Sequence, residues 1–478
     1  MKLILFDYNY LPYEIKFLKK EIVKMGGKIK SYKNKEIEVV GLSSKSASKL
    51  TYIKYVVDNN ETFETLQSLR EQINGKAQRI SQSTRYGPHG LHEYKGKFNP
   101  QTPRSLLLQN FKKGAKILDP FMGSGTTLIE ALDLEMEAYG IELNPFAFEI
   151  TKAKLLFENL DKLPKFSVNR KSQKSFSTES ENYLSKWFTR PQYKDLVIIL
   201  GSIDKLPASN RLIPKIVLSD QIRKNSLQDP RDLRIRRRRN PPTNSSLLED
   251  FIDKYNHIVD VHKRWKELYP VTAKKDPNIY LGDSTKLDQY IKVGIDGTVC
   301  SPPYFSALPY VDTYRLSMVS LELIDPKSIV TEERKLIGAR DITKQEKENE
   351  FKHLNLLPSS INKLVMDIQN LLVRDKSAGF RKRAVPFNLI RYSRLMQSVL
   401  KSLYSIEKNG ALNLWVIGSN RVVVNNKDII IDTPDIVSKL AKSVGFKKVV
   451  LDEVDAYSRY DLHSKNSIKR EMVLKFSK

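Results

Sequence analysis

The apolar residues of this chain recur with two different periods, which predicts a mixed α/β protein. Helical spacing is clearest after Thr433-Pro434, where the apolar positions share one face of a helix that should end at Gly445. Short continuous apolar runs, typical of buried strands, occur at 116–118, 138–141, 279–281, 298–300, 412–417 and 471–476. Strands that alternate with helices in this way predict a doubly wound sheet.

The first 80 residues predict a small α+β module of their own. A strand at 3–6 precedes an amphipathic helix at 13–24, and a second strand and a second helix are expected at 36–42 and 46–57. Since the segment carries no recognisable catalytic arrangement, we expect residues 1–80 to be an accessory module.

A glycine-rich stretch at 116–145, KILDPFMGSGTTLIEALDLEMEAYGIELNP, predicts a nucleotide-type binding site. Its pattern is a strand, a glycine loop, a helix and a second strand that ends on Glu142. Gly123 and Gly125 permit positive φ and close approach of a ligand, and the helix start at Thr126 offers free N–H groups. An acid at the tip of the second strand can accept two hydrogen bonds from a ribose diol.

Two common nucleotide motifs are excluded. A dinucleotide site would need a third glycine where Leu128 stands, and a phosphate-binding loop would need a lysine that the stretch lacks. The run DPFMGSGTT followed by GIELNP resembles instead the S-adenosylmethionine-binding motif of the DNA amino-methyltransferases, and it implies a Rossmann-like methyltransferase sheet. The cofactor-binding residues implied by this resemblance are Asp119, Pro120, Phe121, Gly123, Ser124, Gly125, Thr126, Thr127 and Glu142.

Two further segments extend the resemblance to the cofactor site. Lys97 and Phe98 lie in a segment similar to the one that covers the methionine end of the cofactor in this family, where a cation could meet its carboxylate. A solvated basic turn is the alternative for this segment. Asp283 follows the expected strand at 279–281, where the family carries an acid that accepts a hydrogen bond from the adenine amino group.

The second motif is Ser301-Pro-Pro-Tyr304, directly after the expected strand at 298–300. Two prolines hold the strand end in a rigid, non-helical bend. Ser301 and the Pro302 carbonyl can thus direct acceptors at one point, while Tyr304 offers a ring face to a flat base. The motif resembles the catalytic sequence of the amino-methyltransferases, whose serine form is associated mainly with cytosine N4. It implies catalytic roles for Ser301, Pro302, Pro303 and Tyr304, whereas Cys300 is expected to be a small buried hydrophobe rather than a nucleophile.

The composition of the chain indicates which partners, metal sites and cellular location to expect. The 478 residues carry a formal net charge of +26, which favours nucleic acid as a polyanionic partner, although a general lysine-rich bias would give the same charge. The single cysteine excludes an intramolecular disulfide and a Cys₂ or Cys₄ zinc site, and the histidines lack ligand spacing, so no metal site is expected. The absence of a signal peptide and of a membrane-length apolar run predicts a cytoplasmic protein.

Two charged segments interrupt the expected core. Residues 151–278 have weak periodicity and contain the most basic run of the chain. Arginine suits both phosphate contacts and guanine edges, and a solvated loop is the alternative for this run. The candidate DNA-binding residues are Arg231, Arg234, Arg236, Arg237, Arg238 and Arg239. Residues 326–385 are expected to be helical and highly charged, with Arg340, Arg381, Lys382 and Arg383 as candidate contacts to the DNA backbone.

Together these features predict a methyltransferase core formed by 81–150, 279–325 and 386–478, with insertions at 151–278 and 326–385. The hypothesis is methylation of cytosine N4 in double-stranded DNA, with base flipping, direct methyl transfer and a cognate restriction endonuclease as a candidate partner. The alternatives are adenine N6 in DNA and guanosine N2 in tRNA, the latter because residues 1–80 loosely resemble the ferredoxin-like part of some tRNA methyltransferases. A nucleic-acid-binding module with a relict fold is disfavoured, since both motifs are intact.

Overall fold

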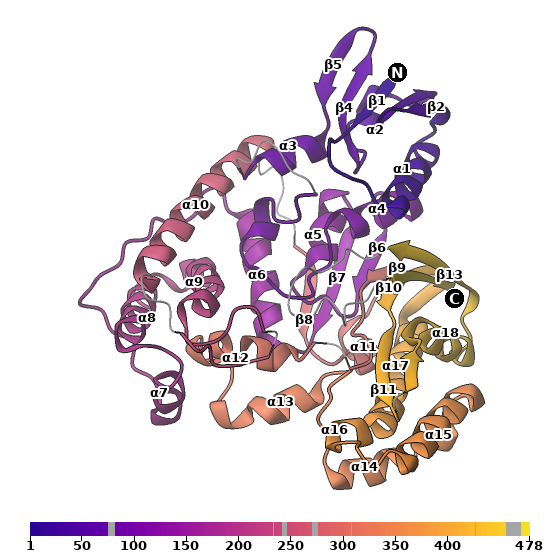
Figure 1. Ribbon diagram of the computed structural model, residues 1–478. Coiled ribbons are helices and arrows are strands. Elements are labelled where there is room, and N and C mark those ends of the chain that lie inside the picture. Colours follow the sequence, from indigo (N-terminus) through magenta and orange to yellow (C-terminus); the bar gives the residue numbers. More distant parts are fainter. Residues whose placement is uncertain are drawn as a thin grey trace.

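The computed structural model describes residues 1–74, 82–232, 234–240, 246–269, 276–306, 308–425, 427–455 and 470–478. The end of the predicted N-terminal module and short parts of the predicted insertions and core fall in the gaps, outside the described residues. Figure 1 shows a central sheet with the N-terminal module above it, a group of helices on the left and another helical group at the lower right.

A seven-stranded sheet forms the centre of the molecule, in the order β13-β14-β10-β9-β6-β7-β8. The neighbours from β10 to β8 are parallel, whereas β14 is antiparallel to both β10 and β13. The chain begins this sheet at β6, winds outward to β8 and then returns to the other side of β6 at β9, so the winding direction changes between β6 and β9. The strands are β6 (Lys116–Asp119), β7 (Glu137–Glu142), β8 (Asn278–Leu281), β9 (Ile295–Cys300), β10 (Glu407–Gly418), β13 (Lys447–Asp455) and β14 (Arg470–Ser477).

Both faces of this sheet are covered, because successive strand residues point to opposite sides. Ile117 and Val299 face one hydrophobic cluster, while Leu118 and Cys300 face another. The first face is covered by α4 (Gln101–Asn110), α5 (Thr126–Asp133) and the N-terminal module, and the second by α11 (Leu287–Tyr290), α17 (Val385–Ile406) and α18 (Thr433–Val444). The predicted α/β fold with a large, mostly parallel sheet is confirmed.

The N-terminal residues form a separate antiparallel sheet in the order β2-β3-β1-β4-β5. Its elements are β1 (Lys2–Leu5), α1 (Pro12–Lys24), β2 (Lys28–Lys33), β3 (Glu36–Val40), α2 (Ser44–Ala47), β4 (Ile53–Asp58), β5 (Glu61–Glu64) and α3 (Leu66–Gln72). The predicted helix at 46–57 is wrong. The short helix α2 ends at Ala47, and the strand β4 occupies most of the predicted range. The β-branched residues Ile53, Val56 and Val57 favour a strand, and β4 pairs with β1 at the centre of this sheet.

The segment 151–278 is more regular than its weak periodicity predicted. Its described part contains α7 (Thr178–Leu184), α8 (Arg190–Ile203), α9 (Leu212–Asn225) and α10 (Leu247–Leu268), which pack with α6 (Pro145–Asn159) and α12 (Tyr310–Ser320) around one apolar cluster. The second predicted insertion is helical as expected, with α13 (Ile329–Lys335), α14 (Lys344–Phe351), α15 (Ser359–Arg374) and α16 (Phe380–Arg383). A hairpin of β11 (Asn420–Val424) and β12 (Lys427–Ile431) lies beside them. No described helix combines the length and the hydropathy that a bilayer crossing requires.

Candidate active site

A cleft opens at the carboxyl ends of the four adjacent parallel strands β9, β6, β7 and β8. This is the edge at which open α/β sheets bind ligands, next to the point where the winding direction changes. The cleft brings together most of the residues that the sequence predicted for the cofactor and catalysis. Those that line it are Lys97, Phe98, Asp119, Pro120, Phe121, Gly123, Ser124, Thr126, Thr127, Glu142, Asp283, Ser301 and Pro303.

The glycine loop between β6 and α5 adopts a conformation that only glycine tolerates well. Gly123 and Gly125 have φ values of +51° and +73°. A Cβ on Gly125 would lie 2.7 Å from Thr151 Cγ2, because α6 packs directly against the loop, whereas nothing lies closer than 3.9 Å to a Cβ position on Gly123. The loop is therefore closed by α6 on the Gly125 side and open on the Gly123 side, where a ligand can approach the backbone.

A buried lysine on α6, Lys154, forms hydrogen bonds with the glycine loop. Its side chain, on α6, is completely buried, and its Nζ donates to the Ser124 carbonyl at 2.6 Å and lies 3.3 Å from Ser124 Oγ. Burial lowers the pKa of Lys154 well below the usual lysine range. Lys154 was not predicted to contact the loop, because a single lysine at a helical position gives no signal of this contact in the sequence.

Two buried carboxylates, Asp119 and Glu142, lie at the ends of β6 and β7. The backbone N–H of Phe121 donates to Asp119 at 3.0 Å. The Glu142 carboxylate accepts the N–H of Gly123 at 2.8 Å and that of Asn144 at 2.7 Å. Desolvation raises the pKa of each carboxyl to about 7 despite these hydrogen bonds. Both groups can thus change their charge near neutral pH.

Asp283 follows β8 and lines the same cleft as the glycine loop. Its side chain accepts the Thr285 N–H at 2.9 Å and so caps the short turn that follows. The neighbouring Ser284 hydroxyl donates to the Pro120 carbonyl at 2.5 Å, which ties the end of β8 to the end of β6. The acid predicted for the adenine end therefore has a fixed position at the rim of the cleft.

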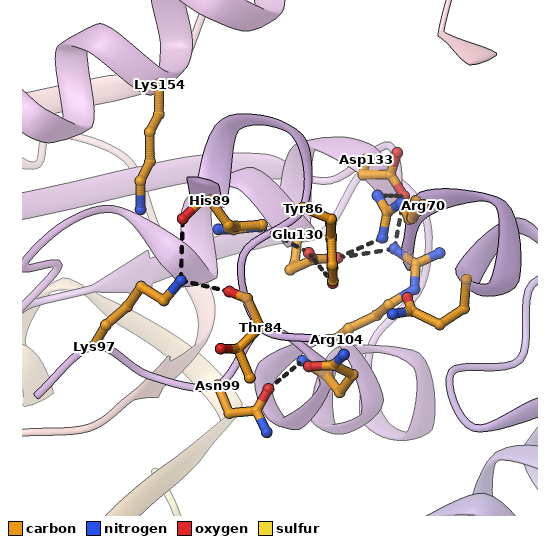
Figure 2. Close-up of polar contacts among 12 residues, drawn as sticks. Arg70, Thr84, Tyr86, His89, Lys97, Asn99, Arg104, Glu130, Asp133 and Lys154 are labelled. Atoms are coloured by element: carbon orange, nitrogen blue, oxygen red, sulfur yellow. Dashed lines mark hydrogen bonds and ion pairs between the residues drawn. The ribbon is translucent and has the colours of Figure 1, made fainter. Parts of the chain in front are cut away.

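Lys97 is placed by backbone acceptors. Its Nζ donates to the Thr84 carbonyl at 2.5 Å and to the His89 carbonyl at 3.2 Å (Figure 2). Burial lowers the pKa of Lys97 to about 7. Since an ammonium group has three N–H donors, one remains for a group in the cleft that Lys97 lines.

Beside Lys97, a buried ion network connects three helices of the molecule (Figure 2). Arg70 on α3 and Arg104 on α4 each lie 3.0 Å from the same Glu130 oxygen, and Asp133 accepts them at 2.8 and 2.6 Å. His89 contacts the other Glu130 oxygen at 3.0 Å. Glu130 lies on α5, which begins at the glycine loop, so this network fixes the helix that carries the loop.

The serine–proline motif follows β9 at the open edge of the cleft. Ser301 and Pro303 line the cleft, whereas Pro302 is buried beneath it. The Tyr304 hydroxyl donates to Glu471 on β14 at 2.8 Å and lies 3.4 Å from Ser301 Oγ. The Tyr304 ring packs against the apolar cluster that contains Leu118 and Cys300. Tyr304 is not among the residues that line the cleft. The thiol of Cys300 is completely buried in that cluster, and burial raises its pKa well above the usual range.

The predicted arginine run lies away from this cleft, and most of its described side chains have partners within the chain. Arg231 pairs with Asp229 at 3.0 Å, and Arg236 lies 3.7 Å from Asp232. Arg237 donates to the Lys186 carbonyl at 2.8 Å, while Arg238 donates to the Gln228 and Lys224 carbonyls. These contacts hold the run against α9 and the end of α7.

The cleft also contains residues that sequence analysis missed. Tyr94 and Tyr310 line it, and their rings stack with centroids 6.0 Å apart. Leu336 and Ile337 follow α13 and approach from the segment predicted as an insertion, and Leu395 comes from α17. Tyr94 lies three residues before Lys97, but nothing in its local sequence marks it as a residue of the cleft. The others come from distant segments, and their contribution depends on the tertiary fold.

Comparisons with known proteins show similarity to DNA methyltransferases. A family model described as DNA methylase matches residues 14–153, which include part of the N-terminal module, the glycine loop and β7. The Type II methyltransferase M.MjaII of Methanocaldococcus jannaschii is 37% identical over 115 residues, covering 21% of this chain and 22% of that protein. M.BsoBI of Geobacillus stearothermophilus is 24% identical over 315 residues and 58% of each chain. M.MvaI of Kocuria varians is 34% identical over 102 residues, covering 20% of this chain and 22% of that protein.

The chain spans less than two thirds of the length of these curated relatives. In the described part of the chain, no three His, Cys, Asp or Glu side chains lie together in a way that could hold a metal ion.

Proposed function

We propose, on the premise that this chain belongs to the DNA amino-methyltransferase family, that it transfers a methyl group from S-adenosylmethionine to the N4 amine of cytosine in duplex DNA. The resemblance to this family that the two motifs indicated is confirmed by the family model and the Type II relatives. The observation that carries the proposal is that both motifs, which lie about 180 residues apart in the sequence, line one cleft.

The residues that line the cleft have the chemistry that the cofactor requires. The open side of the glycine loop at Gly123 leaves the backbone accessible, and the Glu142 carboxylate retains lone pairs for a ribose diol in addition to its two backbone partners. We assign Asp283 to the adenine end and Lys97 to the carboxylate of the methionine end. Phe98 and Phe121 supply apolar lining between the polar groups. When bound, the cofactor would supply an activated methyl group on a sulfonium sulfur.

The serine–proline motif is suited to an amine that is a poor nucleophile. The lone pair of a cytosine amino group is delocalised into the ring. The Ser301 hydroxyl and the Pro302 carbonyl would accept its N–H groups, draw them out of the ring plane and raise the basicity of the nitrogen. Oriented acceptors and close positioning would then provide most of the rate acceleration. We assign Tyr304 to stacking on the base, which would require its ring to turn from the apolar cluster into the cleft. The burial of the Cys300 thiol argues against covalent catalysis by that residue.

Duplex DNA as the substrate requires a flipped base, since the amine is otherwise inside the helix. The net charge of +26 supports a polyanionic substrate. The serine at position 301 supports cytosine N4 over the two alternatives, adenine N6 and tRNA guanosine N2. A restriction endonuclease with the same target sequence is a candidate partner, because the relatives are Type II methyltransferases.

Nucleoside mass spectrometry of DNA from cells that express the protein tests this proposal. We expect N4-methylcytosine in DNA from these cells and none in DNA from cells that express the Ser301→Ala variant. N6-methyladenine would replace the cytosine assignment with its alternative. Methylated guanosine in tRNA together with unmodified DNA would contradict the choice of substrate.

A further inference from the structure

A second cavity, of about 380 Å³, lies on the opposite side of the 335–341 segment from the cofactor cleft. Its walls come from four segments that are distant in sequence, namely the loop at 234–235, α12 with the residues before it, α13 with the residues after it, and α16. The charged residues that line it are Arg234, Asp312, Arg315, Glu333, Arg340, Asp341 and Arg381.

Two of the acidic side chains in this cavity, Asp312 and Glu333, already have ion-pair or hydrogen-bond partners within the chain. Asp312 lies 3.3 Å from Arg315, and it also accepts the Ile235 N–H. Glu333 accepts the backbone N–H groups of Val311 and Asp312 at the start of α12, at 2.8 and 3.2 Å. Burial raises the pKa of Glu333 to about 7, so a large share of this carboxyl is neutral at physiological pH. With Asp341 as the remaining acid, the four arginines of the cavity still outnumber its three acids.

Three arginines converge on the cavity from separate elements. Arg340 donates to the Ser306 carbonyl at 2.8 Å. Burial lowers the Arg340 pKa, and so does the positive charge of Arg234 and Arg381. Within the described residues, the Arg234 and Arg381 side chains form no ion pair or hydrogen bond. Only the ring of the adjacent Phe380 lies near Arg381, at 5.5 Å. Arginines that outnumber the acids lining the same cavity indicate a site for an anion.

The cavity adjoins the serine–proline motif. A Cβ on Gly338 would lie 2.8 Å from the Tyr304 carbonyl, so this segment packs directly on the motif. The contact of Arg340 with Ser306 ties the cavity wall to the residues that follow Tyr304. Lys335, Leu336 and Ile337 line the cofactor cleft, while Gly338, Arg340 and Asp341 line the cavity, so the two spaces share one wall.

We propose that this cavity binds a phosphate of the DNA backbone next to the nucleotide that enters the active site. Arg234 and Arg381 would hold the phosphate oxygens, with Arg340 at the side that contacts the motif. The inference rests on the proposed function only for the position of the target nucleotide. It also separates Arg234 from the rest of the arginine run, whose members Arg231, Arg236, Arg237 and Arg238 have partners within the chain.

The test is equilibrium binding of a labelled DNA duplex as a function of salt, with the double variant Arg234→Gln/Arg381→Gln. Its matched control is Arg264→Gln/Arg374→Gln, which removes two exposed arginines of α10 and α15 outside the cavity. A lost phosphate contact should lower the magnitude of the log-affinity against log-salt slope by about one. It should also weaken binding about tenfold or more at low salt. The control should keep nearly the wild-type slope, and Arg234→Lys/Arg381→Lys should restore most of it.

The outcomes separate this inference from the proposed function. An unchanged slope in the cavity variant, or the same change in the control, overturns the phosphate site, even if the wild type methylates DNA normally. A loss confined to one DNA sequence with an unchanged slope also overturns it, because it would indicate a base contact. A selective fall in slope together with a wild type that methylates no DNA supports the phosphate site and contradicts the proposed function.

Discussion

Glu142 accepts two backbone N–H groups with a carboxyl whose pKa is raised to about 7 by burial, so its charge changes within the physiological range. Hydroxyl donors of a ribose bind the ionised form better than the protonated form. Through Glu142 alone, the affinity for S-adenosylmethionine should therefore rise by up to about tenfold as pH increases from 6 to 8. Deprotonation of Lys97, whose pKa is also about 7, acts in the opposite direction, so the full rise is expected in the Lys97→Met variant. Calorimetry at pH 6, 7 and 8 measures this rise.

Asp119 titrates in the same pH range, so its effect on the pH dependence of cofactor binding must be distinguished from that of Glu142. We expect Asp119→Asn to retain a rise in affinity with pH, and Glu142→Gln to bind weakly and to lose the contribution of Glu142. An affinity of Lys97→Met that is flat between pH 6 and 8, or a full pH dependence in Glu142→Gln, would remove Glu142 from the ribose site.

The stability of the ligand-free protein should change with pH in the opposite direction. The Asp119 side chain is only 4% exposed, and burial raises its pKa from 3.8 to about 7. Its contribution to stability is fully present below pH 4 and is lost as pH rises through 7. Asp119→Asn should thus be more stable than the wild type at pH 8, by on the order of a few kcal/mol at most, with little advantage at pH 4. Urea unfolding at both pH values measures the difference, and equal effects would contradict the raised pKa.

Ser301 is predicted to act on the target amine and not on the cofactor. Ser301→Ala leaves the Pro302 carbonyl in place, so turnover should fall by about 10² or more while cofactor affinity persists. Cys300→Ala is the matched control, because it removes a buried group from the adjacent position without touching the cleft. Single-turnover kinetics should show a defect in Ser301→Ala only. A similar loss of turnover in Cys300→Ala would reopen the role of the thiol.

The residues of the cleft differ in how far the sequence could predict them. Asp119, Gly123, Glu142 and Ser301 lie in two motifs whose residue types follow directly from their chemistry, and one cleft brings them together. Lys154 and Tyr94 have no such local signature. Lys154 is visible only once α6 packs beneath the glycine loop, and Tyr94 only once its ring meets Tyr310.

At the scale of elements, six of the seven strands of the central sheet were predicted, because they contain continuous apolar runs between glycine or polar turns. The edge strand β13 was not predicted, because charged residues interrupt its apolar positions. The helices of 151–278 were not predicted, although α10 carries apolar residues at helical spacing, from Phe251 through Tyr255 and Ile258 to Trp265. The signal was present there and was obscured by the many charged residues between these positions. The prediction of a helix at 46–57 failed for a different reason. The β-branched residues of β4 favour a strand, and helical spacing alone did not reveal this preference.

The glycine loop gives a prediction at this scale. Gly125→Ala would place a methyl group 2.7 Å from Thr151 in a residue with φ of +73°, so α6 or the loop must move. We expect a clear loss of both stability and cofactor affinity. Gly114→Ala is a suitable control, since Gly114 has φ of +77° but no neighbour within 4 Å, and should cost only about 1–2 kcal/mol from backbone strain. Thermal unfolding measures the stability of both variants, and calorimetry measures their cofactor affinity. The comparison separates the effect of backbone strain from that of the steric clash with Thr151. Equal effects of the two substitutions would mean that packing of α6 on the loop is unimportant.

At the scale of the whole molecule, the N-terminal module and the core share one apolar interior. A single cluster contains Leu3 and Phe17 of the module together with Ile117 and Val299 of the central sheet. The family model likewise extends from residue 14 to 153 and so includes part of both. The division at residue 80 remains a prediction, but the packing makes the module part of the structure that supports the glycine loop.

The buried ion network allows this connection to be tested. Arg70 lies on α3 of the module, its side chain is completely buried, and it contacts Glu130 and Asp133 of α5 at 3.0 and 2.8 Å. Removing one member of a buried ion pair leaves its partner uncompensated, so Arg70→Met should cost about 3–5 kcal/mol of stability. Because α5 begins at the glycine loop, cofactor affinity should fall as well.

Lys113→Met provides the comparison, because Lys113 pairs with Glu135 at the surface, where the two side chains are 74% and 56% exposed. Solvent and salt screen such a pair, so its removal should change stability little. Urea unfolding and cofactor titration of both variants would measure the two effects side by side. If Arg70→Met folds as stably as Lys113→Met and binds the cofactor as the wild type does, the network does not couple the module to the glycine loop. A loss of stability with unchanged affinity would restrict its role to holding α3 on the core.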